Sequence, residues 1–185
     1  MKGKVVDTRI RLLAVTDVRG TIAINENDRT DWGSPEDKRL FKEITTRSGL
    51  VVMGRKTYEA IGKRLPGRYN VVLSTKGVFS CGEPDLVLNG NVSQIIQELR
   101  NRGFEDVCVI GGQTLFSQFL NAGLVTDLHL TIEPIILPDG LNLFSNIDKH
   151  YSLRFEKAQI LNSKGTIYVH YRIGELGNKI QGLKI

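Results

Sequence analysis

The sequence contains few cysteines, one tryptophan and no long apolar run. Its two cysteines, Cys81 and Cys108, have no metal-ligand spacing, and the three histidines are scattered, so we expect neither a disulfide framework nor a metal centre. No apolar run approaches the roughly 18–20 residues that cross a bilayer. The first residues, MKGKVVDTRI, lack the apolar stretch of a signal peptide. These absences favour a cytoplasmic protein that does not enter a membrane.

The size and charge of the chain set the next limits. At 185 residues with 41% hydrophobic residues, it has the length and composition of one globular domain, which we place at residues 1–185 with a core of about 9–173. The net charge of +5 comes from basic residues spread along the chain, so a solvated basic surface is the simplest explanation. No nucleic-acid-binding motif is present, and small anionic ligands are the better alternative.

The segment from residue 49 to residue 75 carries the clearest pattern. Two apolar runs, Leu50–Met53 and Tyr69–Leu73, are typical of short strands, with a helical segment and the Leu65–Arg68 turn between them. The first run ends at Gly54–Thr57 and the second at Ser74–Lys76. Ligands of open α/β sheets bind outside the carboxyl ends of the strands. The hydroxyl and basic groups at these two positions are therefore candidates for binding an anion.

A second junction of the same kind lies further along the chain. The apolar run Asp106–Ile110 ends at Gly111-Gly112, and a helix is predicted over Gln113–Leu120. Two glycines between a strand and a helix let the backbone approach a phosphate closely. Any tight turn between a strand and a helix could also use them, so both interpretations stay open.

Asp37 is the strongest candidate for an acidic functional group. Ser34 and Pro35 predict a helix start, and at the third position Asp37 could simply complete a capping box. However, Phe41 and Ile44 follow it on the apolar face of the same helix, which places the carboxylate on the buried side. A buried carboxylate without a partner is costly and is a candidate functional group.

The remaining elements are predicted from their patterning. Strands are expected over Arg9–Thr16, Leu86–Leu88 and Asp127–Ile136, and a helix over Val92–Arg102. Ser152–Leu161 and Thr166–Ile173 are expected to form a terminal antiparallel hairpin. The tail of residues 174–185 is expected either to fray or to dock on a partner subunit, so a monomer and a homodimer are both open.

These motifs resemble the dihydrofolate reductase family. The resemblance rests on the Gly-Arg-x-Thr start of a helix at Gly54, the Leu-Pro-Gly-Arg turn, the strand ending in two hydroxyl residues, Val109–Gly112, and Pro35-x-Asp37-x-x-x-Phe41-Lys42. It implies an α/β fold with a central, mostly parallel sheet flanked by helices and an antiparallel C-terminal hairpin. It also implies NADPH-dependent reduction of dihydrofolate to tetrahydrofolate, in support of one-carbon and nucleotide metabolism.

The resemblance implies a role for residues at two subsites. Asp37 and Thr131 would be catalytic. The substrate would contact Trp32, Asp37, Phe41, Ile61, Leu65, Arg68 and Thr131. The NADPH cofactor would contact Ala14, Ile22, Gly54, Arg55, Lys56, Thr57, Ser74, Thr75, Lys76, Ile110, Gly111, Gly112, Gln113, Thr114 and Leu115. Thr114 stands where many members have an arginine, so selection of the 2′-phosphate would depend on Arg55, supported by Thr75 and Lys76. The loop of residues 22–32, which would close over the nicotinamide, is longer than in the best-known members.

Two other functions remain open. The stretch DWGSPEDKRLFKEIT is also similar to the riboflavin-pathway reductase, which shares this fold and acts on a ribosylamino-pyrimidine. Arg68 discriminates between the two, because it resembles the arginine that grips the α-carboxylate of folate, although a surface arginine in a turn is the simpler alternative. A non-catalytic basic binding module is the third possibility, and a buried Asp37 speaks against it.

Overall fold

The structure is a computed structural model, and it describes residues 8–174. In this range the strands are β1 (Arg9–Thr16), β2 (Thr21–Ala23), β3 (Leu50–Gly54), β4 (Tyr69–Leu73), β5 (Leu86–Leu88), β6 (Asp106–Val109), β7 (Asp127–Ile132), β8 (Leu141–Asn142), β9 (Ser152–Ile160) and β10 (Ile167–Gly174). The helices are α1 (Pro35–Ser48), α2 (Arg55–Ile61), α3 (Val92–Asn101) and α4 (Gln113–Asn121).

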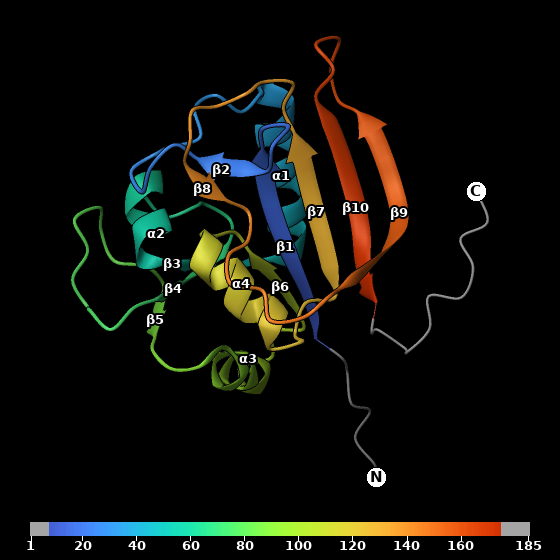
Figure 1. Cartoon of the computed structure of the whole chain (residues 1–185). Helices are drawn as coiled ribbons and strands as arrows, with labels where there is room; N and C mark the ends of the chain where they lie inside the picture. The colour runs from blue at the N-terminus through green and yellow to red at the C-terminus, as the bar shows by residue number, and fades with distance from the viewer. Residues whose placement is uncertain (1–7, 175–185) are drawn as a thin grey trace.

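The main sheet has eight strands in the order β5-β4-β3-β6-β1-β7-β10-β9 (Figure 1). All neighbours from β5 to β7 are parallel, whereas β10 pairs antiparallel with both β7 and β9. The predicted fold class, a mostly parallel sheet with an antiparallel C-terminal hairpin, is therefore confirmed. Parallel strands are buried on both faces, which explains the continuous apolar runs in β3 and β6.

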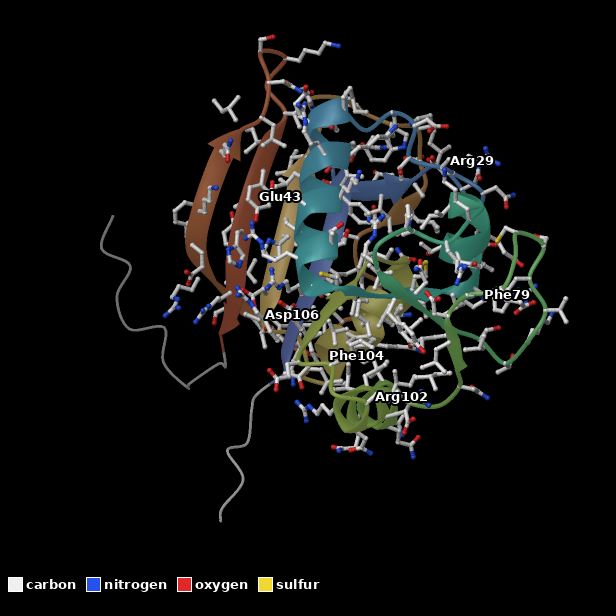
Figure 2. The ribbon with its side chains drawn as sticks, turned by 180° about the vertical axis from the view of Figure 1, so that it is seen from behind. Arg29, Glu43, Phe79, Arg102, Phe104 and Asp106 are labelled. Atoms are coloured by element: carbon white, nitrogen blue, oxygen red, sulfur yellow. The ribbon has the colours of Figure 1, made fainter. Side chains whose placement is uncertain are left out.

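The helices cover the two faces of the sheet. One core cluster joins the apolar sides of α3 and α4 to β1, β3 and β6, and includes Phe116, Phe119 and Leu99. The other cluster joins α1 and α2 to the opposite face, where Tyr58 and Met53 are fully buried. Figure 2, seen from behind, shows α1 crossing the sheet on that second face. In both views, no helix lies over β9.

Helix α1 begins and ends where its sequence predicts. The Oγ of Ser34 accepts a hydrogen bond from the backbone N–H of Asp37 at 3.2 Å, and Pro35 occupies the first turn. Gly49 ends the helix with φ of 77°, a left-handed conformation that glycine adopts without strain. Since both ends are fixed, the position of Asp37 on the first turn is fixed as well.

The structure corrects one predicted strand and adds a small sheet. The strand predicted over 127–136 ends at Ile132, because the chain turns at Glu133 and Pro134, whose ring supplies no N–H to a ladder. The strands β2 and β8, which pair antiparallel as a separate sheet, were too short to be predicted from patterning. No helix within residues 8–174 is long and apolar enough to cross a membrane. The predicted tail lies outside the described residues, apart from Gly174.

Candidate active site

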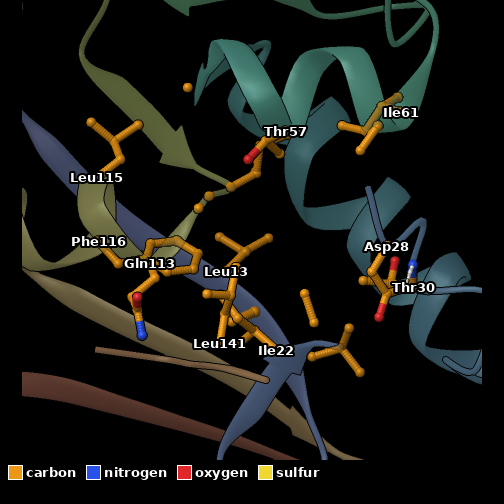
Figure 3. Close-up of a pocket in the computed structure, with 18 of the residues that line it drawn as sticks. Leu13, Ile22, Asp28, Thr30, Thr57, Ile61, Gln113, Leu115, Phe116 and Leu141 are labelled. Carbon is orange, nitrogen blue, oxygen red and sulfur yellow. Dashed lines mark hydrogen bonds between the residues drawn. The ribbon is translucent and has the colours of Figure 1, made fainter. Parts of the chain in front are cut away.

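A cavity of about 640 Å³ opens at the carboxyl ends of the central strands (Figure 3). It lies between the loop after β2, the first turns of α1 and α2, and the start of α4. Predicted site residues among those lining it are Ala14, Ile22, Asp37, Phe41, Gly54, Arg55, Lys56, Thr57, Ile61, Leu65, Ile110, Gly111, Gly112, Gln113, Thr114, Leu115 and Thr131. One cavity therefore brings together residues predicted for the substrate and residues predicted for the cofactor.

Asp37 is only 9% exposed, and it faces this cavity rather than acting as a cap. In a capping box, the carboxylate of the third residue accepts the N–H of the N-cap residue. Here the N–H of Ser34 donates instead to Glu133 Oε1 at 2.7 Å. Glu133, which follows β7, thus supplies the second half of the cap. The carboxylate of Asp37 remains available to the cavity.

The surroundings of Asp37 disfavour its charged form. Burial raises the pKa of Asp37 to about 6, and the negative charge of Glu133 adds to this shift. The hydrogen bond with Thr131 and the positive charge of Lys38 oppose it, but they do not offset the burial. A carboxyl group with a pKa near neutrality can exchange a proton under physiological conditions.

The Gly111–Gly112 turn forms the opposite wall of the cavity. The peptide bond between these residues is cis, and Gly54 N–H donates to the carbonyl of Gly111 at 2.9 Å, which joins the two strand–helix junctions. Gly112 is the N-cap of α4 and provides no capping side chain. A Cβ on Gly112 would lie 3.3 Å from Thr57 Oγ1. The turn is therefore a narrow backbone cradle with free N–H groups at a helix start, which fits a phosphate group.

The basic residues on α2 line the cavity but have protein partners. Arg55 forms an ion pair with Glu59 at 2.7 Å and lies over the ring of Phe79, 5.0 Å from its centroid. Its buried Nη1 atom has no hydrogen-bond partner within the described residues. Lys56 forms an ion pair with Glu26, which belongs to the loop after β2. This contact ties the loop to the first turn of α2 across the mouth of the cavity.

Arg68 is held beside α1 without an acidic partner. Its Nη1 donates to Thr45 Oγ1 at 2.9 Å, and its Nε donates to the carbonyl of Pro66 at 3.1 Å. No carboxylate in residues 8–174 forms an ion pair with it, and burial lowers its pKa from the ordinary value. The neighbouring Arg64, by contrast, pairs with Asp85 at 2.7 Å. Arg68 is thus a half-buried cation that could bind an anion.

Five predicted site residues are not among those lining the cavity. They are Trp32, Arg68, Ser74, Thr75 and Lys76. Trp32 donates from Nε1 to Asp28 Oδ2 at 3.2 Å, so it is fixed to the loop of residues 24–31. Ser74 Oγ exchanges hydrogen bonds with the backbone of Lys76, which forms a tight turn after β4. The structure does not bring these residues to the cavity wall, and their roles stay predictions.

Sequence reasoning missed several polar groups on the cavity side of the sheet. Glu133 was placed inside a strand, His129 was noted only as one of three scattered histidines, and Tyr168 was not singled out. His129 Nδ1 and Tyr168 Oη lie 2.6 Å apart, and both residues line the cavity. Burial, together with the nearby His170, lowers the pKa of His129 to about 3, so the ring is neutral. Two-residue periodicity with Thr131 could have placed His129 on the same face.

His129 also belongs to a cluster with Asp127 and His170. Possible ligand atoms of the three lie within 4.8 Å of one another, but the two imidazole rings are stacked, 4.2 Å apart and 8° from parallel. A metal ion lies close to the plane of each imidazole that binds it, so two parallel rings cannot share an ion without turning. Both carboxylate oxygens of Asp127 accept hydrogen bonds from Arg9, at 2.7 and 2.9 Å. These contacts favour a structural cluster.

Comparison with known proteins identifies the family that this site belongs to. The family profile described as "Dihydrofolate reductase" matches residues 9–173. The chain belongs to the dihydrofolate reductase family. It is 31% identical over 154 residues to the dihydrofolate reductase of Neisseria gonorrhoeae, covering 81% of this chain and 90% of that protein.

Two solved structures share the fold of this chain. A dihydrofolate reductase from Enterococcus faecalis, in complex with NADP(H), has a TM-score of 0.73 at 25% identity and covers 91% of this chain and 98% of its own. A putative riboflavin biosynthesis protein from a Shewanella species has a TM-score of 0.77 at 23% identity, covering 90% and 99%. The chain therefore has the fold of the dihydrofolate reductase family and is a reductase of that family. Which substrate it reduces depends on the residues of the site.

Proposed function

We propose that this protein reduces 7,8-dihydrofolate to 5,6,7,8-tetrahydrofolate with NADPH, in the cytoplasm, as one domain. The observation that carries the proposal is the single cavity that joins a buried carboxyl group, Asp37, to the glycine cradle at Gly111–Gly112. A hydride transfer needs the two reacting rings side by side in a site from which water is excluded. The apolar side chains of Phe41, Ile61 and Leu115 on the cavity wall supply such surroundings.

The residues present fit a nicotinamide dinucleotide. NADPH, when bound, supplies the hydride. The N–H groups at the start of α4, with Thr57, would hold the pyrophosphate beside the glycine turn. Arg55, which lines the cavity, would reach the 2′-phosphate if its guanidinium turned to bring the buried, unpartnered Nη1 toward the ligand. Ala14 and Ile22 would bound the nicotinamide end.

Asp37 would orient the pterin and favour its protonation. Its carboxylate would accept hydrogen bonds from the amidine N–H groups of the pterin, and Thr131, which lines the same cavity, would support the charged form. A pKa of about 6 allows the group to promote proton delivery through water to the imine nitrogen, the atom next to the carbon that is reduced. Such a group is needed because hydride addition to an unprotonated imine would leave an amide anion.

Arg68 would bind the α-carboxylate of the glutamate tail of folate. A guanidinium fork matches a carboxylate, and Arg68 has a free charge but no acidic partner in the described residues. Arg68→Leu should raise the Michaelis constant for dihydrofolate by an amount equivalent to ~2–4 kcal/mol, with little change for NADPH. Arg64→Leu is the matched control, because it removes an arginine four residues earlier. That arginine is already paired with Asp85. If dihydrofolate binds Arg68→Leu as tightly as the parent, this role is refuted.

The alternative is reduction of a ribosylamino-pyrimidine, as in the riboflavin pathway. One observation favours it: the basic residues Arg29 and Lys38 line the cavity, whereas Arg68 does not. A ribose phosphate would then lie against Arg29 and Lys38. The test is the rate of NADPH oxidation with the pyrimidine substrate. If this rate is unchanged in Arg68→Leu and reduced in Arg29→Ala, the alternative is supported and the folate assignment is contradicted. Failure to oxidise NADPH with either substrate would favour the non-catalytic module.

A further inference from the structure

The outer strand of the main sheet, β9, has no covering layer. It is an edge strand of nine residues, and every one of them is exposed. Figures 1 and 2 show β9 beyond the helices on both faces of the sheet. An edge strand presents a row of unpaired N–H and C=O groups, and long apolar edges are normally protected in stable monomers. The free edge of β9 carries a bulge and charged side chains, so a strand that pairs with it must match a particular pattern.

The two faces of β9 differ in chemistry because of a bulge. In the pairing with β10, Lys157 lies opposite His170 and Phe155 opposite Tyr171, so Glu156 is an extra residue that reverses the alternation. Cross-strand partners share a face. One face of β9 therefore carries Leu153, Phe155, Ala158 and Ile160, and the other carries Arg154, Glu156, Lys157 and Gln159. Leu153, Phe155 and Ile160 are 47%, 61% and 70% exposed.

The apolar face of β9 is continuous with the hydrophobic core of the sheet. Its neighbours on β10, Tyr171 and Ile173, pack against the core cluster beneath α3 and α4. The apolar surface then extends outward onto β9, where no helix covers it. Ile167 at the start of β10 is exposed as well, at 39%. Contiguous apolar surface next to free backbone groups marks a protein interface.

We propose that β9 pairs antiparallel with β9 of a second copy of this chain, which joins two sheets into one around a two-fold axis. The axis lies between Glu156 and Lys157. In this register Glu156 of each copy faces Lys157 of the other, Leu153 faces Ile160, and Phe155 faces Ala158. Arg154 faces Gln159. Every pair combines residues from the same face of the strand, and the charges at the centre are opposite.

A second copy fits this edge better than other occupants. If the register is shifted by two residues in either direction, a residue of the apolar face lies opposite a residue of the polar face. Because of the bulge, the proposed register avoids such mixed pairs. The other edge strand of the main sheet, β5, has three residues and could not match β9 along its length. A two-fold interface also uses each favourable pair twice, which is the usual route to a homodimer.

The first test measures the solution mass of the full chain by light scattering at micromolar concentrations. The parent should be a dimer. Ile160→Ser should weaken dimerisation tenfold or more, because the Leu153–Ile160 pair occurs twice. Ile136→Ser is the matched control, since Ile136 is 73% exposed and lies on another part of the surface. It should leave the dimer unchanged. A parent that stays monomeric, or equal effects of the two variants, would overturn the proposal.

The second test exchanges the central charges. Lys157→Glu sets like charges against each other twice and should dissociate the dimer, whereas combining it with Glu156→Lys should restore the dimer. A double variant as monomeric as the single one would contradict the register. A chain ending at Gly174 separates this interface from one made by residues 175–185. The shortened chain should remain a dimer, and its loss of dimerisation would assign the interface to the tail.

Discussion

The substitution Asp37→Asn should stabilise the protein near neutral pH while removing its activity. Burial raises the pKa of Asp37 from 3.8 to about 6. Between these two values the folded chain holds a proton that the unfolded chain has released, so the free energy of unfolding falls as pH rises through this window. Each pKa unit corresponds to about 1.4 kcal/mol, which gives a cost of ~3 kcal/mol for the ionised carboxylate. Asparagine has nearly the same shape and carries no charge, so it avoids this cost.

The assay is urea denaturation of parent and variant at a series of pH values from about 4 to 7. The variant should gain ~2–3 kcal/mol over the parent between the lowest and highest pH, with most of the change below the folded pKa. Asp139→Asn is the control, because that side chain is fully exposed and its substitution should show no such trend. A stability difference between Asp37→Asn and parent that does not depend on pH would refute the reasoning.

Two further substitutions test the groups around the cavity. Glu133→Gln keeps an acceptor for Ser34 but removes the charge that helps to raise the pKa of Asp37, so the pH–rate profile should shift to lower pH. A pH–rate profile that does not move would show that Glu133 has no influence on Asp37. Arg55→Ala should weaken NADPH by ~1.5–3 kcal/mol with little effect on NADH, whereas Glu59→Gln, which frees the arginine, should not weaken NADPH. The measurement is the ratio of the specificity constants for NADPH and NADH. If this ratio is the same in the parent, Arg55→Ala and Glu59→Gln, residues other than Arg55 select the cofactor.

The fold was largely predictable because its elements carry strong local signals. Continuous apolar runs marked β3, β4 and β6, and each helix began after a capping residue or a glycine. The strand predicted over 127–136 was too long, although Pro134, which has no N–H to donate to a ladder, could have marked its end. The contact of Glu133 with the N-cap of α1, by contrast, joins residues distant in sequence.

The site was predictable where a residue's role depends on its own element. Asp37 was identified from the apolar face of one helix, and Gly111–Gly112 from one strand–helix junction. Glu133 and the His129–Tyr168 contact depend on how β7, β10 and α1 meet, and no spacing in the sequence encodes this. The ion pair of Lys56 with Glu26 is of the same kind, since it joins a polar loop to a helix.

The most direct test of the proposed function is NADPH oxidation, followed by nicotinamide absorbance, with the purified full chain and dihydrofolate. We expect the parent to consume NADPH with dihydrofolate and not with the ribosylamino-pyrimidine. Asp37→Asn should lose orders of magnitude in turnover near pH 7 and recover part of it at low pH, where the substrate arrives protonated. Full turnover by Asp37→Asn near pH 7, or NADPH oxidation with the pyrimidine alone, would contradict the account.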